Sequence, residues 1–161
     1  MDAVVAVYEN WGIGRDGTQP VVLSADRRHF RAITGNGAVI YGRKTLLDFP
    51  GGKPLPGRCN AVLTRRTDFS VPGAIVCRSP QAAILATQEY EDCFVIGGES
   101  VYRQMLPYCR RVFLTRIYLA PACDAFFPDL DASEAWEITE QSERLEENGI
   151  SYAFFTYTRK E

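Results

Sequence analysis

Short apolar runs of strand length recur along the chain and predict its sheet. Four of them contain almost no polar residue: Ala3 to Tyr8, Ala38 to Tyr41, Cys59 to Thr64 and Cys93 to Gly97. A run without polar alternation is typical of a strand that is covered on both faces, as in a parallel sheet between helices. Two further runs predict shorter or later strands of the same sheet: Ile75 to Cys77 and Val112 to Leu119.

Two helices are predicted in the first third of the chain. Ser24 is the expected N-cap of the first helix, which ends at Gly35. Asp26 then lies in the first turn, where any carboxylate complements the helix dipole, so its position alone does not assign a role. The second helix is short and opens at Arg43, directly after the strand that Gly42 closes.

Two more helices are predicted in the middle of the chain. Ser79 as N-cap and Pro80 at the first helical position begin one of them. Its expected buried face consists of three apolar residues: Ala82, Leu85 and Ala86. The other begins near Val101 and is limited by Pro107.

Three segments are predicted as loops. Glu9 to Ser24 is rich in glycine and long for a connection, so we interpret it as a lid over a site; a surface loop pinned by Trp11 is the alternative. Prolines and glycines between Pro50 and Arg58 exclude a helix or a central strand there. Asp124 to Pro128 is the third loop and combines aromatic and acidic residues.

The tail changes to the pattern of antiparallel strands. Apolar residues alternate with polar ones around Trp136 and Ile138 and again from Tyr152 to Thr156, with Glu146 to Gly149 as the turn. The element order is therefore mostly βαβ, finished by a hairpin. We expect one α/β domain over residues 1–161, an open and largely parallel sheet with helices on both faces and an antiparallel edge.

Composition and charge narrow the class of partner. The net charge of -2 arises from 18 basic and 20 acidic residues, which creates no field suited to a nucleic-acid backbone, so we expect a small-molecule partner. Neither a signal peptide nor a membrane-spanning window is predicted. Five widely spaced cysteines suit reduced thiols in the cytoplasm better than a disulfide framework, and with one histidine we expect no metal site.

Three turns are expected to meet at the carboxyl edge of the predicted sheet, where open α/β sheets bind ligands. Gly97 and Gly98 carry no side chains where the first N–H groups of a helix point outward, so a phosphate can approach the backbone there. Gly42 to Thr45 and Thr64 to Arg66 add cations and hydroxyls. Taken singly, close packing and solvated basic turns are the alternatives; together the three turns predict a site for a phosphorylated dinucleotide.

Several motifs occur together in the order and approximate spacing found in dihydrofolate reductases. They are Asn10-Trp11-Gly12-Ile13-Gly14, Ser24-Ala25-Asp26 with Phe30, Val39 to Thr45, Pro54 to Arg58, Val95 to Gly98 with Tyr102, and Phe127-Pro128-Asp129. The likeness covers nearly the whole chain, and the sequence resembles the bacterial type of this family. The resemblance implies a mostly parallel eight-stranded sheet with a C-terminal hairpin and about four helices.

The same resemblance implies a function. The family reduces 7,8-dihydrofolate to 5,6,7,8-tetrahydrofolate with NADPH, by hydride transfer to C6 and protonation of N5, in support of one-carbon metabolism and thymidylate synthesis. It also implies that the protein binds antifolates and works as a monomer in the cytoplasm.

Site residues carried over from the family fall into two sets. Asp26, supported by Thr115, resembles the carboxylate that binds the 2-amino group and N3 of the pterin, and these two are the expected catalytic residues. The remaining expected substrate-binding residues are Val4, Val5, Ala6, Arg27, Phe30, Arg31, Phe49, Leu55, Arg58 and Ile96. The expected cofactor-binding residues are Ala6, Ile13, Gly14, Gly42, Arg43, Lys44, Thr45, Thr64, Arg65, Ile96, Gly97, Gly98, Glu99, Ser100, Val101 and Tyr102. The family's Gly97-Gly98 peptide is cis.

Two positions depart from the family's pattern. Val21 follows Pro20 where the family usually has a tryptophan, so we expect altered lid packing and antifolate affinity without loss of the reaction. Arg27 follows Asp26 where an apolar residue is common, and it either lies exposed or reaches the glutamate tail.

Two other functions remain as alternatives. A riboflavin-pathway reductase shares the sheet and NADPH but acts on a ribosylamino-pyrimidine, for which Asp26 and Arg58 have no evident use. A nucleotide-binding module without catalysis would bind NADPH and show no turnover.

Overall fold

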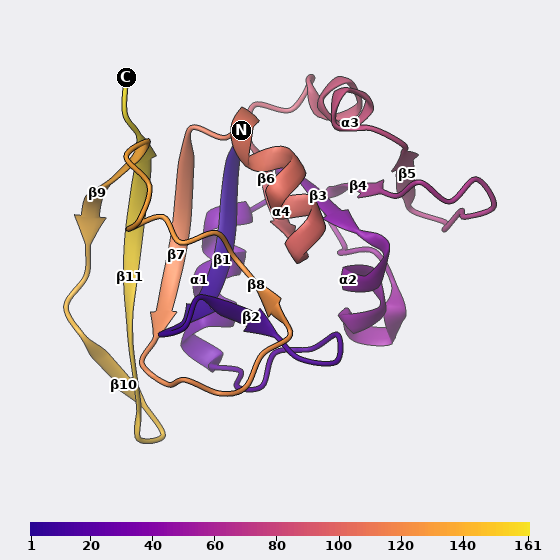
Figure 1. Ribbon diagram of the computed structural model, residues 1–161. Helices are drawn as coiled ribbons and strands as arrows, with labels where there is room; N and C mark the ends of the chain where they lie inside the picture. The colour runs from indigo at the N-terminus through magenta and orange to yellow at the C-terminus, as the bar shows by residue number, and fades with distance from the viewer.

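A central sheet of nine strands organises the structure, a computed structural model that describes residues 1–161. The order along the sheet is β10-β11-β7-β1-β6-β3-β4-β5, and β9 also pairs with β11 (Figure 1). The strands are β1 (Asp2–Tyr8), β3 (Ala38–Gly42), β4 (Cys59–Leu63), β5 (Ala74–Cys77), β6 (Cys93–Gly97), β7 (Arg111–Ile117), β9 (Trp136–Gln141), β10 (Leu145–Glu147) and β11 (Ile150–Arg159). All strands from β7 to β5 in this order pair in parallel, and β11 runs antiparallel to β7.

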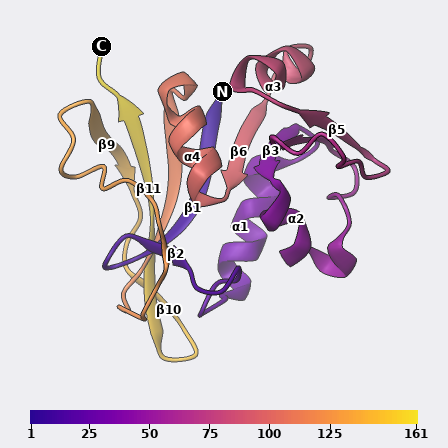
Figure 2. The same ribbon diagram turned by 45° about the vertical axis from the view of Figure 1, so that its right-hand side comes forward.

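Four α-helices cover the two faces of the sheet, so the predicted fold class is confirmed. They are α1 (Ser24–Thr34), α2 (Arg43–Asp48), α3 (Pro80–Thr87) and α4 (Glu99–Met105). Figures 1 and 2 show α4 on the front face and α1 behind the sheet. None of the helices has the length and hydropathy needed to cross a membrane.

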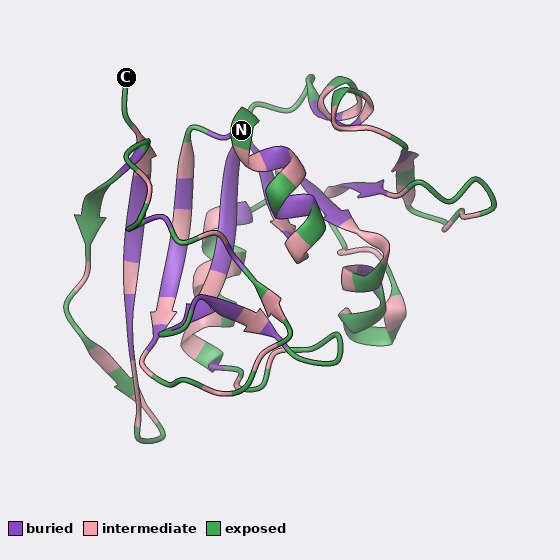
Figure 3. Ribbon diagram, in the orientation of Figure 1, coloured by how far each residue is buried: buried purple, intermediate pink, exposed green.

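The core lies on both sides of the sheet because neighbouring residues of a strand point to opposite faces. Val5 and Val7 of β1 belong to the larger core cluster, which includes Met105 of α4. Tyr8 packs instead with Leu23, next to α1. Figure 3 shows the buried residues concentrated along the central strands, as expected for unbroken apolar runs.

The start of α1 differs from the sequence prediction. Ser24 is the first helical residue, and the N-cap position belongs to Leu23, whose side chain cannot accept a hydrogen bond. The N–H groups of Ser24 and Ala25 donate instead to the carboxylate of Glu147, at 2.7 and 2.9 Å. The prediction failed because the acceptor comes from a strand far away in the sequence.

The start of α3 is confirmed, and so are Ala82 and Ala86 of its predicted face, which pack against the core, but Leu85 does not belong to that face. The Ser79 hydroxyl accepts a hydrogen bond from the N–H of Ala82 at 3.1 Å, as an N-cap should. Leu85, however, is 65% exposed, whereas Ala83 and Thr87 are buried. Small residues face the sheet here because the short helix packs closely on β4 and β5.

Short elements appear inside segments predicted as loops. β2 (Gly12–Gly14) pairs with β8 (Ala125–Phe126) in a small second sheet, next to the end of β1 (Figure 1). The 3₁₀ turns η1 (Pro50–Gly52) and η2 (Leu106–Tyr108) are also present. At the C-terminal hairpin Glu146 and Glu147 belong to β10, so the turn itself is Asn148-Gly149, both with positive φ.

Candidate functional site

Asp26 and Thr115 form the polar pair at the centre of the candidate site. The Thr115 hydroxyl on β7 donates to Oδ1 of Asp26 in the first turn of α1, over 2.6 Å. Thr115 is buried and pairs in the sheet with Ala6 of β1 and Phe154 of β11. Burial raises the pKa of the Asp26 carboxyl, whereas the Thr115 bond and His29 act to lower it. A carboxyl group in this setting is a candidate for binding and proton chemistry.

Two contacts fix the surroundings of this pair. The ring of His29, one turn after Asp26, stacks on Phe154 of β11 with 3.9 Å between centroids. The Tyr8 hydroxyl donates to the carbonyl of Val21 at 2.9 Å and accepts from its N–H at 2.8 Å. The last part of the Glu9 to Ser24 segment is therefore held directly beside the end of β1.

Arg58 lies at the other end of α1 without an acidic partner. Its Nε and Nη2 donate to the Thr34 hydroxyl at 3.3 and 3.2 Å, and Nη1 donates to the Pro56 carbonyl at 3.1 Å. Its guanidinium carbon is 6.0 Å from the centroid of the Phe30 ring. Burial and the neighbouring cation Arg31 both lower the pKa of Arg58. Two adjacent cations without a carboxylate are suited to an anionic ligand group.

A buried asparagine positions the apolar wall next to Arg58. The side chain of Asn60 accepts from the Leu55 N–H and donates to the Leu55 carbonyl, at 3.0 and 2.9 Å. The Tyr41 hydroxyl also donates to Asn60, at 2.7 Å, and the Tyr41 ring packs edge-on against Phe49. Leu55 and Arg58 also border an open depression of about 590 Å³, which is lined by residues 53–58 and 71–73 and not by α1. Sequence analysis missed both Asn60 and Tyr41; a single polar residue inside the apolar run of β4 was the available signal.

The glycine turns bring the starts of α2 and α4 together. The Gly97-Gly98 peptide is cis, as the resemblance implies. A Cβ on Gly97 would lie 3.3 Å from the Thr45 hydroxyl, and a Cβ on Gly42 would lie 3.1 Å from a Val101 methyl, so both glycines are needed for this close approach. Neither helix has a side-chain cap, so backbone N–H groups remain for a ligand. Together with Arg43 and Lys44 beside them, these groups are suited to the phosphate oxygens of a ligand.

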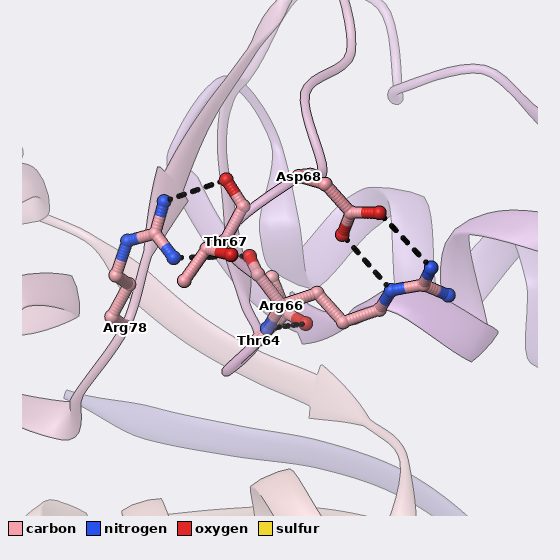
Figure 4. A network of polar contacts seen from close by, with 5 residues as sticks. All are labelled: Thr64, Arg66, Thr67, Asp68 and Arg78. Carbon is pink, nitrogen blue, oxygen red and sulfur yellow. Dashed lines mark hydrogen bonds and ion pairs between the residues drawn. The ribbon is translucent and has the colours of Figure 1, made fainter.

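The loop after β4 supplies further cations, and Figure 4 shows how it is held. The Arg66 N–H donates to the Thr64 hydroxyl at 3.2 Å, and the Arg66 side chain pairs with Asp68 at 3.3 Å. Arg78 donates to the carbonyls of Arg66 and Thr67, at 3.1 and 3.3 Å. Arg65 is exposed and has no hydrogen bond or ion pair within the chain. The free cation and the nearby hydroxyl of Thr64 are suited to a further phosphate group.

Glu99 and Tyr102 of α4 have partners within the chain. The Glu99 carboxylate accepts from the Phe126 N–H of β8 at 2.7 Å, so it holds the small sheet rather than standing free. The Tyr102 hydroxyl donates to the Val4 carbonyl at 2.6 Å and is deeply buried. These contacts tie α4, β1 and the β2–β8 pair into one unit.

The Glu9 to Ser24 segment is anchored to the rest of the fold at several points. Trp11 is buried, and the guanidinium of Arg116 lies 4.6 Å from its ring centroid, so the segment is pinned at its start. Further along, the Asp16 N–H donates to the Asp124 carboxylate at 3.0 Å, and Val21 is bound by Tyr8. The segment is therefore anchored at several points and lies beside the candidate site.

Four further residues carried over from the family differ in their exposure and in their partners within the chain. Val5 points into the core on the α3 and α4 face. Arg27 is exposed, and its side chain makes no hydrogen bond or ion pair within the chain. Ser100 is exposed and accepts a hydrogen bond from Gln104. Ile96 is half-buried beside the cluster that contains Tyr41 and Leu46.

Comparison with known proteins shows which family the chain belongs to. The sequence model described as dihydrofolate reductase matches residues 1–159. The chain belongs to the dihydrofolate reductase family. As a member, it is an NADPH-dependent oxidoreductase that acts on dihydrofolate, and the match favours this function over the riboflavin-pathway alternative.

Relatives in this family cover nearly the whole chain. The dihydrofolate reductase of Neisseria meningitidis serogroup A is 36% identical over 157 residues, which are 97% of this chain and 96% of that protein. That of Bacillus subtilis is 35% identical over 159 residues, 98% of this chain and 93% of that protein. A bifunctional dihydrofolate reductase-thymidylate synthase from Daucus carota is 41% identical over 175 residues, and the match spans 33% of its length.

A solved structure agrees in fold. The dihydrofolate reductase from Enterococcus faecalis, complexed with NADP(H) and RAB-propyl, superposes with a TM-score of 0.88 at 29% identity. The match covers 99% of this chain and 96% of that chain. The glycine turns and the loop after β4 therefore belong to a fold that accepts this cofactor.

Proposed function

We propose that the chain reduces 7,8-dihydrofolate to 5,6,7,8-tetrahydrofolate with NADPH, and that Asp26 is the central group of the site. The observation that carries the proposal is the hydrogen bond between half-buried Asp26 of α1 and buried Thr115 of β7. Thr115 occupies one acceptor position on Oδ1, so the carboxylate keeps others for the 2-amino and N3–H groups of a pterin. Asp26 and Thr115 are thereby assigned as the catalytic residues.

Asp26 both orients the pterin and favours its protonated form. Burial raises the pKa of Asp26 and so disfavours an isolated negative charge there. A proton held between the carboxyl group and the bound pterin is therefore favoured. The proton itself reaches N5 through water, because the carboxyl group binds the opposite edge of the pterin. Val21 and the apolar wall of Phe30, Phe49 and Leu55 limit how much water enters.

The remainder of the substrate lies along α1. Phe30, Phe49 and Leu55 contact the aminobenzoyl ring, and Arg58, supported by Arg31, binds the glutamate carboxylate. The other proposed substrate contacts are Val4, Ala6, Arg27 and Ile96, together with the backbone of Val5, whose side chain points into the core.

The cofactor site is proposed at the carboxyl edge of the sheet. Bound there, NADPH supplies the hydride for C6 of the pterin. Ala6, Ile13, Gly14 and Tyr102 surround the nicotinamide, and Thr64 and Arg65 bind the 2'-phosphate. The pyrophosphate contacts are proposed for Gly42, Arg43, Lys44, Thr45 and Ile96 to Val101.

Dihydrofolate-dependent oxidation of NADPH by the purified protein, with Asp26→Asn beside it, tests the proposal. We expect turnover in the wild type and a loss of at least about a hundredfold in the variant at neutral pH, the usual scale for a proton-handling group. Tight NADPH binding without turnover, and with ligand affinities unchanged in Asp26→Asn, would identify a non-catalytic module. No turnover with dihydrofolate but turnover with a ribosylamino-pyrimidine would favour the riboflavin-pathway alternative.

We also propose that residues 1–161 act as one domain, as a monomer in the cytoplasm. All five cysteines are free, which suits a reducing compartment. Light scattering during size-exclusion chromatography tests the oligomeric state; a mass of two chains at assay concentration would contradict the monomer.

A further inference from the structure

The helix that carries Asp26 begins without a local cap. The first N–H groups of a helix have no partner within it, and leucine at the N-cap supplies none. Leu23 occupies that position in α1, with extended backbone and no side-chain hydrogen bond. Asp26 itself lies in this first turn, but its Oδ1 accepts a hydrogen bond from Thr115 of the sheet. The helix start therefore depends on a group from elsewhere in the chain.

Glu147 provides that group from the C-terminal hairpin. Its Oε2 accepts from the Ser24 N–H at 2.7 Å and its Oε1 from the Ala25 N–H at 2.9 Å, across 122 residues or more of sequence. Both bonds are charge-assisted, which makes them stronger than neutral ones. The hairpin fixes the position of the carboxylate, because Glu147 pairs with Ile150 across the tight Asn148-Gly149 turn.

Glu147 and Thr115 hold the same helical turn from two places in one sheet. Thr115 lies on β7, Glu147 on β10, and β11 pairs with both strands. The side chain of Asp26 is thus fixed by Thr115 and its backbone by Glu147. A shift of the helix start would move the Asp26 carboxyl group relative to a bound pterin, and small displacements of reacting groups are costly.

The charge of Glu147 is also expected to act on Asp26 through the start of the helix. A free helix start attracts negative charge and would favour ionised Asp26. The Glu147 carboxylate offsets this attraction and so favours the uncharged form, in the same direction as burial. The other titratable groups that face Asp26 are Tyr8 on β1, His29 on α1 and Tyr102 on α4.

We infer that Glu147 is a positioning residue for the reduction of dihydrofolate: it caps α1 and sets the place and charge state of Asp26. This inference rests on the proposed function. It assigns a role in the site to the C-terminal hairpin, which the sequence analysis treated only as an edge of the sheet.

Three variants test the inference: Glu147→Ala, Glu147→Gln and Glu146→Ala. The first removes the cap, and the second keeps an acceptor oxygen without the charge. Glu146 is exposed and makes no hydrogen bond or ion pair, so Glu146→Ala is the matched control. The readouts are kcat/KM for dihydrofolate between pH 5 and 9, the KM for NADPH, and thermal unfolding. Because His29 is present in all variants, its titration contributes equally to each pH profile.

We expect Glu147→Ala to lower kcat/KM for dihydrofolate by about tenfold, with the KM for NADPH unchanged within about twofold. The midpoint of its pH profile should move to lower pH, because ionised Asp26 becomes easier to form. Glu147→Gln keeps one of the two acceptor oxygens, so it should recover part of the rate and keep the shifted midpoint, which separates the effect of position from that of charge.

Unchanged kcat/KM and midpoint in Glu147→Ala relative to Glu146→Ala would overturn the inference. So would a loss of thermal stability with equal losses for both substrates and no shift of the midpoint, since that pattern describes a purely structural cap. If Glu147→Ala fails to fold, an unshifted midpoint in Glu147→Gln overturns the electrostatic role. Absence of turnover in the wild type would instead reject the proposed function.

Discussion

The proposed pterin end and the proposed phosphate end of the site are built in different ways. At the pterin end, the hydroxyl of Thr115, which is buried in the sheet, holds the Asp26 carboxylate of α1 over 2.6 Å. At the phosphate end, Arg65 is exposed and the Arg66–Asp68 pair is more than half exposed on both sides. The first end is therefore fixed by short contacts before any ligand binds, whereas the second attracts its ligand by charge. Substitutions at the first end should change rate and pH dependence, and those at the second should change affinity and its salt dependence.

The largest effect among these substitutions is expected at Thr115. Thr115→Val keeps the shape but removes the donor to Asp26, and a hydrogen bond to a charged group corresponds to a loss of about ten- to a hundredfold in kcat/KM for dihydrofolate. Because this bond lowers the pKa of Asp26, the pH midpoint should also rise. Steady-state kinetics across pH measure both effects. A change in the KM for NADPH of the same size would contradict the separation of the two ends.

Arg58 should show a smaller effect that is limited to substrate affinity. Arg58→Met keeps much of the apolar stem and removes the charge, so we expect the KM for dihydrofolate to rise about tenfold with kcat nearly unchanged. Arg28→Met is the control, because Arg28 is exposed on the same helix and has no hydrogen bond or ion pair. Equal KM values in the two variants would argue against Arg58 as the carboxylate-binding residue.

Arg65 tests the charge-dependent end. Arg65→Ala should weaken NADPH binding about fivefold at low salt, and the difference should shrink as salt is added, because exposed charges are screened. NADH lacks the 2'-phosphate, so its affinity should not change. Arg66→Ala is the comparison and should have a smaller effect, since Asp68 already neutralises Arg66. A loss that is equal for NADPH and NADH would place Arg65 away from the 2'-phosphate.

The smallest effect is expected at Val21, on the lid beside the pterin end. Its backbone is fixed by Tyr8, so a larger side chain at this position should pack against the ligand rather than move the loop. Val21→Trp should therefore change the inhibition constants of diaminopyrimidine antifolates by about threefold while dihydrofolate turnover is kept. Equal inhibition constants in the wild type and the variant would contradict a role for this position in antifolate affinity.

Sequence patterns predicted the sheet well because buried parallel strands are unbroken apolar runs. The same reasoning missed β2 and β8, whose two or three residues per strand are too few to show a period. Leu85 was placed on the wrong face of α3 because the helix is short and mostly alanine and other apolar residues, so its pattern does not distinguish the faces.

The candidate site was predicted where family motifs are local in sequence, as at Asp26 and the glycine turns. Sequence patterns did not reveal the residues that support the site from distant parts of the sequence. Ser24 looked like a cap because serine is a common one, and nothing local indicates that Glu147 takes that role. Asn60 and Tyr41, which hold Leu55, likewise meet only in the folded sheet.

The central claim is that Asp26 makes the pterin easier to protonate, and the pH dependence of Asp26→Asn tests it most directly. Rates of dihydrofolate reduction should be measured for the wild type and Asp26→Asn from neutral to acidic pH, where solvent protonates N5 without help. The account predicts a large difference at neutral pH that narrows as the pH falls. A ratio of the two rates that stays the same at every pH would contradict it.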